Sequence, residues 1–410
     1  MGEILFLAHR MPFPPDRGDK IRSHHILRGL AGIAPVHVAT FADTESDREM
    51  EAALGEVAAS HVLVSRRKPL ALAGLQALAT GKPVSLTAFA DARLQAWVWK
   101  TLAERPIDTV FVFSGQMGQY VPAGFGGRVI VDLCDVDSAK FGTYAETASW
   151  PRSVAMRRED RLLRAEEARL VERADVTLLI SREEAALLHS RLPPGAEANL
   201  VALGNGIDAT FFDPAYAAAH PGVSARPGPH IVFTGQMDYP PNVAASLRVI
   251  TRLLPALRIR YPTAEFHVVG RAPVRELLEH DGKGGVTVWG EVADVRPFLL
   301  AADSVVAPLE LARGVQNKVL EAMAMCRPVV LSEEAATGIA ATDGTHFAIA
   351  RDDAAMIAAI TGLIEDRPAA HRMGRMARDF VLREHGWSTV HDKLRDIVSR
   401  NRLNDVRDAA

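Results

Sequence analysis

One strand–loop–helix–strand segment in the last third of the chain constrains the fold more than any other. Residues 302–308 form an apolar run that predicts a buried strand, a helix begins near Gln316, and residues 328–331 predict a second buried strand. Two parallel strands joined by a helix form a βαβ unit, whose sheet is covered by helices on both faces. Ligands of such open sheets bind at the carboxyl ends of the strands. The segment therefore predicts a ligand site in the loop and helix between its two strands.

Lys318 and Glu321 indicate the chemistry of this site. They are three residues apart, so they share one face of the predicted helix. Lys318 lies in the first turn, where free N–H groups and the helix dipole favour an anion, and Glu321 can accept two hydrogen bonds from a ribose diol. The pair predicts a nucleoside diphosphate site. Such pairs also occur on solvated helix faces, but the apolar residues around Glu321 favour a carboxylate that needs a partner.

The alternation of strands and helices continues through both halves of the chain, with a junction near the middle. Asn205 and Gly206 mark a turn, and the Pro/Gly-rich residues 221–229 are typical of a linker. We therefore expect an α/β protein with two doubly wound parallel sheets and a final amphipathic helix. The expected parts are residues 1–205, residues 206–386 and residues 387–410.

Composition and charge are those of a globular protein of this size. The 410 residues are long for one domain and sufficient for two. A net charge of −3 gives no general footprint for nucleic acid, so we expect no nucleic-acid partner. Cys134 and Cys326 are far apart and lack metal or disulfide spacing, as expected of free thiols in a reducing compartment. No apolar run is long enough for a signal sequence or a membrane span, so we expect a cytoplasmic protein.

Five further stretches form a pattern, in the order PFPPDRGDKIRSHHILRGLA (12–31), VDLCDVDSAKF (131–141), LGNGIDATFFDP (203–214), FTGQMDYPPNVAA (233–245) and KVLEAMAMCRPVV (318–330). Together they resemble the family 4 glycosyltransferases of the GT-B fold. They are most similar to the exosortase A-associated (PEP-CTERM system) sugar transferases of bacterial exopolysaccharide loci. The resemblance implies two Rossmann-like domains facing a cleft, an acceptor-side domain followed by a nucleotide-sugar-binding domain. It also implies that the last helix crosses back to the first domain.

The loop over residues 12–20 resembles the glycine loop that covers the donor phosphates from the first domain. Gly18 is its main residue, because glycine permits close approach of a ligand to the backbone. An ordinary proline-rich loop is the alternative. The polar candidates in the loop are Asp16, Arg17, Asp19 and Lys20.

In the second domain the resemblance implies a donor site built around Gly235. The arginine and lysine that many relatives carry after this glycine are absent, so Lys318 and Arg271 would supply the positive charge. Glu321 would hold the ribose. The backbone at Val292 would pair with the nucleobase, although a plain turn at this point is the alternative.

The chain departs from the family pattern at two more positions. Arg313 occupies the place of the family's first glutamate, and Cys134 occupies the place of a histidine that precedes an aspartate. Asp135 is then the predicted catalytic residue of the first domain, where it would orient the acceptor or the donor sugar, and Lys318 is that of the second. Contacts with the sugar hydroxyls would come from Gly314, Gln316 and Asn317.

Two alternatives remain open for Asp135. With Asp137 it spells the D-x-D pattern by which metal-dependent transferases of the other fold hold a divalent cation. Asp is also a favoured helix N-cap, so these aspartates could instead cap the segment that follows. We expect a reaction that needs no metal and no cofactor besides the donor.

A basic cluster precedes an apolar segment in the first domain. Arg66, Arg67 and Lys68 come directly before residues 69–79, which are rich in Leu and Ala. This combination can lie on an anionic membrane surface, which would make the protein peripheral on the inner membrane and suit a lipid-linked acceptor. The alternative is a solvated loop before a core helix.

The resemblance implies retaining transfer of a hexose from a nucleotide diphosphate sugar to a saccharide, free or lipid-linked, in exopolysaccharide or glycoconjugate synthesis. Lys318, helix N-termini and glycine-loop amides would stabilise the departing nucleoside diphosphate. A nucleotide-sugar epimerase is one alternative. A non-catalytic nucleotide-sugar-binding component of a polysaccharide assembly complex is another, which the missing family residues favour.

Overall fold

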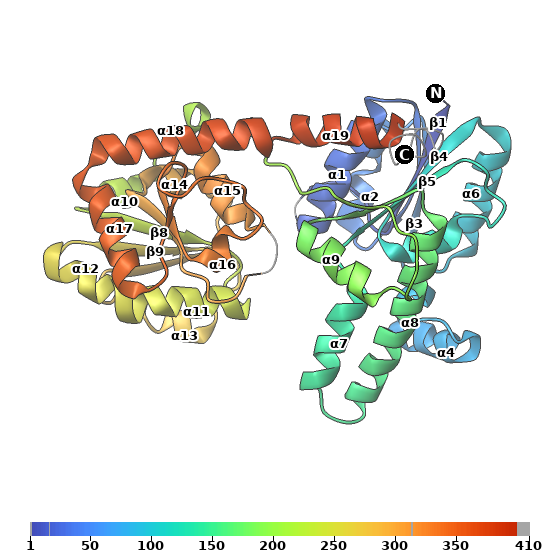
Figure 1. Ribbon diagram of the computed structural model, residues 1–410, viewed down its shortest axis with the longest axis horizontal. Coiled ribbons are helices and arrows are strands. Elements are labelled where there is room, and N and C mark those ends of the chain that lie inside the picture. Colours follow the sequence, from blue (N-terminus) through green and yellow to red (C-terminus); the bar gives the residue numbers. More distant parts are fainter. Residues whose placement is uncertain (1, 16, 313–314, 400–410) are drawn as a thin grey trace. The chain divides into compact units, whose positions relative to one another are not determined.

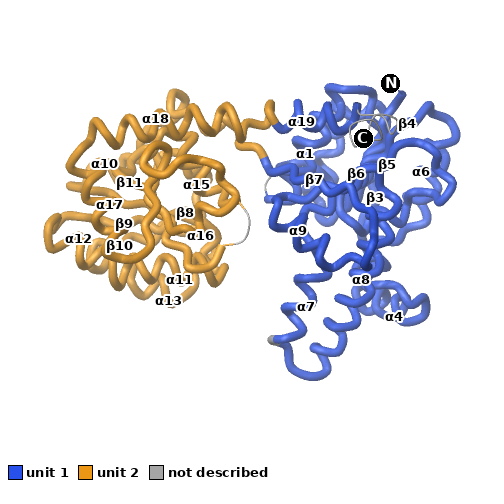
Figure 2. Tube along the Cα trace, in the orientation of Figure 1, with its two compact units in different colours: residues 1–205, 390–410 blue, residues 206–389 orange. Residues whose placement is uncertain are grey.

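The computed structural model describes residues 2–15, 17–312 and 315–399 (Figure 1). The chain divides into two compact units (Figure 2). Unit 1 comprises residues 1–205 and 390–410, and unit 2 comprises residues 206–389. Within each unit, strands alternate with helices along the chain.

The described part of unit 1 contains a seven-stranded sheet in the order β3-β2-β1-β4-β5-β6-β7, with every neighbouring pair parallel. The chain runs outward from β1 to β3 and then returns to β4 on the other side of β1. This reversal makes the sheet doubly wound and places its topological switch point between β1 and β4. The strands are β1 (Glu3–Ala8), β2 (Val36–Ala42), β3 (Ser60–Ser65), β4 (Ile107–Phe113), β5 (Arg128–Cys134), β6 (Val176–Leu179) and β7 (Leu200–Ala202).

The first strand of unit 1 forms where the sequence is continuously apolar after Glu3. Ile4 to Ala8 of β1 are all buried, and Phe6 contacts Phe111 and Phe113 of β4. Burial on both faces is what helices on both sides of a parallel sheet produce. The helices of this unit are α1 (Gly18–Ala31), α2 (Glu45–Glu49), α3 (Glu51–Gly55), α4 (Leu70–Thr80), α5 (Val84–Thr87), α6 (Ala92–Glu104), α7 (Asp137–Thr147), α8 (Arg152–Arg173), α9 (Arg182–Arg191) and most of α19 (Trp387–Ser399).

The described part of unit 2 contains a six-stranded parallel sheet in the order β10-β9-β8-β11-β12-β13. Its switch point lies between β8 and β11, where Val305 pairs with Val232 on one side and with Val329 on the other. The strands are β8 (His230–Thr234), β9 (Glu265–Val269), β10 (Val286–Gly290), β11 (Ser304–Ala307), β12 (Val329–Leu331) and β13 (Ala348–Ile349). The helices are α10 (Pro221–Ser224), α11 (Pro240–Arg248), α12 (Leu254–Arg260), α13 (Arg275–Leu278), α14 (Arg296–Ala301), α15 (Asn317–Ala324), α16 (Glu333–Ala336), α17 (Asp353–Glu365) and α18 (Arg367–Glu384).

Local differences from the sequence prediction have physical causes. Between β2 and β3 the chain forms two short helices, α2 and α3. Thr44 and Asp47 form a capping box that starts α2. The short edge strands β7 and β13 are not predicted, because each is half-buried or exposed and acquires its pairing from a neighbouring strand.

The start of α19 approaches α1 within unit 1. The Nε2 of His391 donates a hydrogen bond to the carbonyl of His25 at 2.9 Å. A Cβ atom on Gly29 would lie 3.0 Å from the side chain of Leu394, so the absent side chain allows this close packing. The segment after residue 389 is therefore part of the body of unit 1.

A buried ion pair fixes α1 to the centre of the sheet in unit 1. Arg22 of α1 donates from Nε and Nη2 to the two carboxylate oxygens of Asp132 in β5, at 2.9 and 3.1 Å. Its Nη1 donates to Oδ1 of Asn205 at 3.0 Å. Asp132 is fully buried and Arg22 nearly so. Burial alone would lower the pKa of Arg22, but Asp132 outweighs this effect and raises it.

Removing one partner of this pair should destabilise unit 1 strongly. Asp132→Ala leaves a guanidinium buried without its counter-charge, and we expect a loss of about 3–5 kcal/mol in the free energy of unfolding, measured by urea denaturation. Replacing both charges, in Arg22→Met/Asp132→Leu, should cost less than the single change. A loss below about 1 kcal/mol for Asp132→Ala would contradict this role.

Candidate functional site

The sheet of unit 2 brings most of the predicted donor residues to one edge. Gly235 directly follows β8, Arg271 follows β9, Val292 follows β10, and Lys318 is the second residue of α15, the helix after β11. Because the strands are parallel, all these positions lie at the carboxyl edge. Gly235 and Lys318 meet where β8 and β11 flank the switch point, although they are far apart in the sequence.

Neutral partners hold the ammonium group of Lys318. Its Nζ donates a hydrogen bond to Oδ1 of Asn242 in α11 and lies 4.8 Å from the ring centroid of Phe233 in β8. Asn242 is itself fixed, because its Nδ2 donates to the carbonyl of Gln236 at 2.9 Å. An amide oxygen and an aromatic face orient a cation without neutralising it. The positive charge of Lys318 therefore stays available to an anion at this edge.

Lys318 and Glu321 each have a strongly shifted pKa. Burial lowers the pKa of Lys318 to about 8, against the opposing effect of Glu321. Burial likewise raises the pKa of Glu321 to about 7, and the nearby Lys318 only partly offsets this. Within the described residues no ion pair joins Glu321 to any cation. Both side chains are half-buried, so the site holds two ionisable groups that are poorly solvated and do not contact an opposite charge among the described residues.

Two glycines are required where the turns after β8 and β9 meet. A Cβ atom on Gly270 would lie 1.6 Å from the carbonyl oxygen of Gly235, and φ is 151° at Gly270. A Cβ atom on Gly235 would lie 2.8 Å from Nδ2 of Asn242 and 3.3 Å from Nζ of Lys318. The predicted close approach of the donor diphosphate to the backbone at Gly235 stays a prediction. In the structure, side-chain atoms of Asn242 and Lys318 lie close to this glycine.

The other donor residues predicted in unit 2 lie in the turns after β9 and β10 and at the start of α15. Arg271 is exposed and its Nη2 donates to Oε1 of Gln236 at 3.0 Å, which places it beside the Gly235 turn. Gln316 precedes α15 without a capping side-chain bond, and Asn317 is exposed. Val292 is half-buried against the core of unit 2. Arg313 and Gly314 lie outside the described residues.

Asp135 of unit 1 is bound to a lysine. Nζ of Lys140 donates to Asp135 at 3.0 Å and to Asp137 at 3.1 Å, and the two carboxylates raise the pKa of Lys140 despite its burial. The prediction that these aspartates cap the next helix is wrong. The N-cap of α7 is Val136, which makes no side-chain cap, and Glu184 accepts the hydrogen bond from its N–H. The catalytic role of Asp135 stays a prediction.

Two of the polar candidates at the loop before α1, Asp19 and Lys20, form ion pairs within unit 1 that stabilise the fold. Asp19 accepts a hydrogen bond from Arg10 at 2.5 Å; burial would raise its pKa, but His9 and Arg10 hold it well below its usual range. Lys20 is buried and pairs with Asp47 at 2.6 Å. A Cβ atom on Gly18 would meet nothing within 4 Å, so the fold alone does not require glycine there. Arg17 pairs with Asp19 and Asp43, and Asp16 lies outside the described residues.

The sequence analysis does not identify two residues, Asn242 and His9, that the structure places near the carboxyl edges of the two sheets. Asn242, which orients Lys318, has no signal in the sequence beyond its place in the first turn of α11, seven residues after Gly235. His9 directly follows β1 at the switch point of unit 1 and stacks on Phe113 with 5.9 Å between ring centroids. Its Nε2 lies 3.5 Å from Asp19, and its buried Nδ1 has no hydrogen-bond partner among the described residues.

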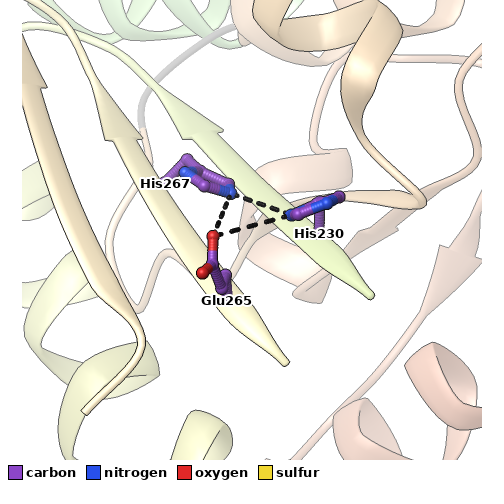
Figure 3. A group of neighbouring side chains, drawn as sticks. All are labelled: His230, Glu265 and His267. Carbon is purple, nitrogen blue, oxygen red and sulfur yellow. Dashed lines mark hydrogen bonds and ion pairs between the residues drawn. The ribbon is translucent and has the colours of Figure 1, made fainter. Parts of the chain in front are cut away.

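A second polar cluster lies at the opposite edge of the unit 2 sheet (Figure 3). His230 begins β8, and Glu265 and His267 lie at the start of β9. Nδ1 of His230 lies 3.1 Å from Nε2 of His267, and Oε2 of Glu265 lies 3.9 and 3.6 Å from these two nitrogens. This spacing is small enough for one cation with three ligands.

A chain of hydrogen bonds accounts for this cluster without a cation. The indole N–H of Trp289 can only donate, and it points at Nδ1 of His267 at 3.2 Å, so His267 has its proton on Nε2. That proton is donated to Nδ1 of His230, whose Nε2 donates to the carbonyl of Arg226 at 3.1 Å. Burial lowers the pKa of His267 to about 3, so the ring is neutral. A metal bound to Nε2 of His267 would displace the proton from that nitrogen. If the proton moved to Nδ1, the indole N–H would lose its acceptor; if it left the ring, the imidazole would have no proton.

Comparison with known proteins finds a match between part of unit 2 and a family of transferases. Residues 228–366 match the family model of glycosyl transferases group 1. Over 202 residues the chain is 30% identical to a phosphatidyl-myo-inositol mannosyltransferase of Mycolicibacterium smegmatis, covering 47% of this chain and 50% of that protein. It is 27% identical over 240 residues to a glycogen synthase of Mycobacterium tuberculosis, covering 56% and 55%. The chain spans about half the length of the curated relatives it matches.

Solved structures match nearly the whole chain. Anabaena Alr3699/HepE, in complex with UDP and glucose, has a TM-score of 0.63 and 16% identity, and the match covers 97% of this chain and 100% of that one. WaaG, a glycosyltransferase involved in lipopolysaccharide biosynthesis, has a TM-score of 0.61 and 17% identity over the same shares. Identities this low show the fold alone. The predicted fold class, two Rossmann-like parallel-sheet domains of the GT-B type, is confirmed.

Neutralising Glu321 should stabilise the free protein. The carboxyl is penalised in the folded state when ionised, so stability is lost as the pH rises from 4.5, its ordinary pKa, through about 7. Glu321→Gln removes this penalty, and we expect a gain of about 1–3 kcal/mol at pH 8 that disappears below about pH 5, measured by thermal unfolding across this range. The exposed Glu334→Gln should change stability by less than about 0.5 kcal/mol. Equal stability of wild type and Glu321→Gln at every pH would contradict the shifted pKa.

Proposed function

We propose that this GT-B protein is a retaining glycosyltransferase that moves a hexose from a nucleotide diphosphate sugar to a hydroxyl of a saccharide acceptor. The observation that carries the proposal is the charge of Lys318. It is oriented by Asn242 and Phe233, left without a counter-ion in the described structure, and placed at the switch point of unit 2. The match of residues 228–366 to glycosyl transferases group 1 supports the same chemistry.

The proposed donor site assigns a separate task to each charged group. Lys318 and the first turn of α15 would bind the diphosphate and stabilise the negative charge that grows on it as the glycosidic bond breaks. Arg271 would add a second positive charge from the turn after β9. Glu321 would accept hydrogen bonds from the ribose hydroxyls. A solved structural neighbour was crystallised with UDP-glucose, which makes a uridine diphosphate sugar the first donor to test.

The proposal assigns an orienting role to Asp135, which would hold the acceptor hydroxyl or the donor sugar. Its pairing with Lys140 fixes the carboxylate in place. The remaining donor contacts are assigned as the sequence predicts them, to Gly18, Gly235, Val292, Gly314, Gln316 and Asn317. No metal or further cofactor is included, because Lys318, Arg271 and a helix N-terminus offer positive potential to the diphosphate.

The biological setting belongs to the same proposal. The resemblance to exosortase A-associated sugar transferases supports a cytoplasmic role in exopolysaccharide or glycoconjugate synthesis. One curated relative is a phosphatidyl-myo-inositol mannosyltransferase, which supports a lipid-linked acceptor and a peripheral position on the inner membrane. The alternatives are an epimerase and a binding component without turnover. The latter is favoured by Gln236, Cys134 and Arg313, which stand where relatives have catalytic or diphosphate-binding residues.

An assay of nucleoside diphosphate release separates these three functions. The purified protein would be incubated with UDP-glucose and other nucleotide sugars, with and without saccharide acceptors. Acceptor-dependent release of the nucleoside diphosphate supports the transferase. A change of the sugar without acceptor and without release identifies an epimerase. Binding of the donor with neither change identifies a binding component, and absence of donor binding contradicts the site.

Binding of UDP should depend on the ionisation of Lys318. Its pKa of about 8 means that the ammonium is present below this pH and lost above it, so affinity measured by calorimetry should fall progressively from about pH 8 upward. Lys318→Arg, whose guanidinium stays charged, should keep its affinity over this range. Lys318→Met should lose at least about tenfold at neutral pH. The control Arg275→Gln, on the exposed helix α13, should bind as wild type, and unchanged binding by Lys318→Met would refute the site.

A further inference from the structure

Helix α4 of unit 1 turns its large apolar side chains outward. Leu70, Leu72, Leu75 and Leu78 are 72%, 54%, 66% and 70% exposed, whereas Ala73 and Ala77 are fully buried. A surface helix ordinarily buries its leucines and exposes its small or polar residues. Single exposed leucines need no explanation, but four on one helix of eleven residues form an apolar patch of the kind that marks an interaction surface.

Hydrogen bonds hold α4 in this orientation from both ends. Nη2 of Arg158, in α8, donates to the carbonyls of Ala77 at 2.8 Å and Lys82 at 3.2 Å. Oγ1 of Thr87 donates to the carbonyl of Ala73 at 2.8 Å. The helix therefore lies beside α8, as Figure 1 also shows, with its alanine side fixed against unit 1. The leucines face outward because the fold holds them there.

The basic cluster before α4 is mostly occupied by internal contacts. Nε of Arg66 donates to Asp43 at 2.6 Å, and Nζ of Lys68 donates to the carbonyls of Thr87 and Ala90 at 2.8 and 2.6 Å. Arg66 is thus paired with an acid, and Lys68 uses all three N–H groups internally, because it also donates to Gln76 at 3.1 Å. Neither side chain is free to bind a partner. Arg67 is exposed and forms no ion pair with any described residue. The predicted membrane contact through all three residues is thus reduced to Arg67.

The surroundings of the leucine face are nevertheless cationic. Residues 57–90 contain no Asp and no Glu. The nearby Glu159 is buried and accepts hydrogen bonds from the N–H groups of Val84 and Ser85, so it adds no exposed negative charge. Four exposed cations lie in the residues directly before and after α4 or in the adjoining helix α8, and they lack ion-pair partners among the described residues. They are Arg67, Lys82, Arg157 and Arg161.

We propose that the α4 face of unit 1 docks on an anionic phospholipid surface. Leu70, Leu72, Leu75 and Leu78 would enter the boundary between headgroups and acyl chains, and the four surrounding cations would bind lipid phosphates. A second copy of this chain is a poorer occupant, because a two-fold contact would place these like charges against one another. Within the described residues no helix is long and apolar enough to cross a bilayer, so the contact lies at the interface.

Vesicle co-sedimentation of the full chain, without nucleotide, tests this surface independently of the donor site. The wild type should bind vesicles of phosphatidylcholine with phosphatidylglycerol and not vesicles of phosphatidylcholine alone, and salt should weaken the binding. Leu72→Glu/Leu75→Glu should lower the affinity by at least about tenfold. Arg157→Gln/Arg161→Gln should lower it by about fivefold or more for each charge removed.

Matched controls keep the outcomes separate. Ile259→Glu and Arg275→Gln change an exposed apolar residue and an exposed cation of unit 2, and they should leave binding unchanged. Circular dichroism should show that the leucine variant is folded, because both leucines are more than half exposed. Undiminished binding by the leucine variant, or no binding of wild type to either vesicle, overturns the proposal. A dimer that the leucine variant dissociates, without lipid binding, overturns it in favour of a second copy.

Discussion

Parallel pairing of strands that are buried on both faces is the constraint on which both units depend. Parallel neighbours cannot be joined by tight turns, so every connection crosses the sheet through a helix or a long loop. All the strands of one unit therefore end at the same edge. The reversals after β3 and β10 place β4 beside β1 and β11 beside β8, and the switch point of each sheet lies between these neighbours. The position of Lys318 against Phe233 and Asn242 follows from this winding.

Unit 1 and unit 2 use their buried charges differently. In unit 1, Arg22 pairs with Asp132, and Lys20 with Asp47, so these charges stabilise the fold and are unavailable to a ligand. In unit 2, Lys318 and Glu321 are half-buried without opposite charges in contact, and burial moves the pKa of each toward its neutral form. Such groups reduce the stability of the free protein, which is expected where a ligand completes the site.

The two surfaces singled out in unit 1 and unit 2 have the same physical origin. Partners supplied by distant segments fix one part of a side chain or helix and leave another part unsatisfied. Asn242 orients Lys318 and leaves its charge without a counter-ion, and Arg158 anchors α4 and leaves its leucines exposed. The cluster of His230, Glu265 and His267 shows the opposite case, because Trp289 and Arg226 complete its hydrogen bonds internally.

The sequence by itself determined the architecture of the two units and the position of Lys318 and Glu321 on one helix. Strands such as β11 and β12 are short, mostly apolar runs that are buried along their whole length, as local composition and spacing predict. The tertiary structure alone decided which charges remain available. Lys68 is taken by carbonyls of the α5 region, Lys20 by Asp47, and Lys318 is left uncompensated beside Asn242. The local sequence indicates a role for Lys318 but not whether its charge stays available, because that depends on partners that only folding brings near.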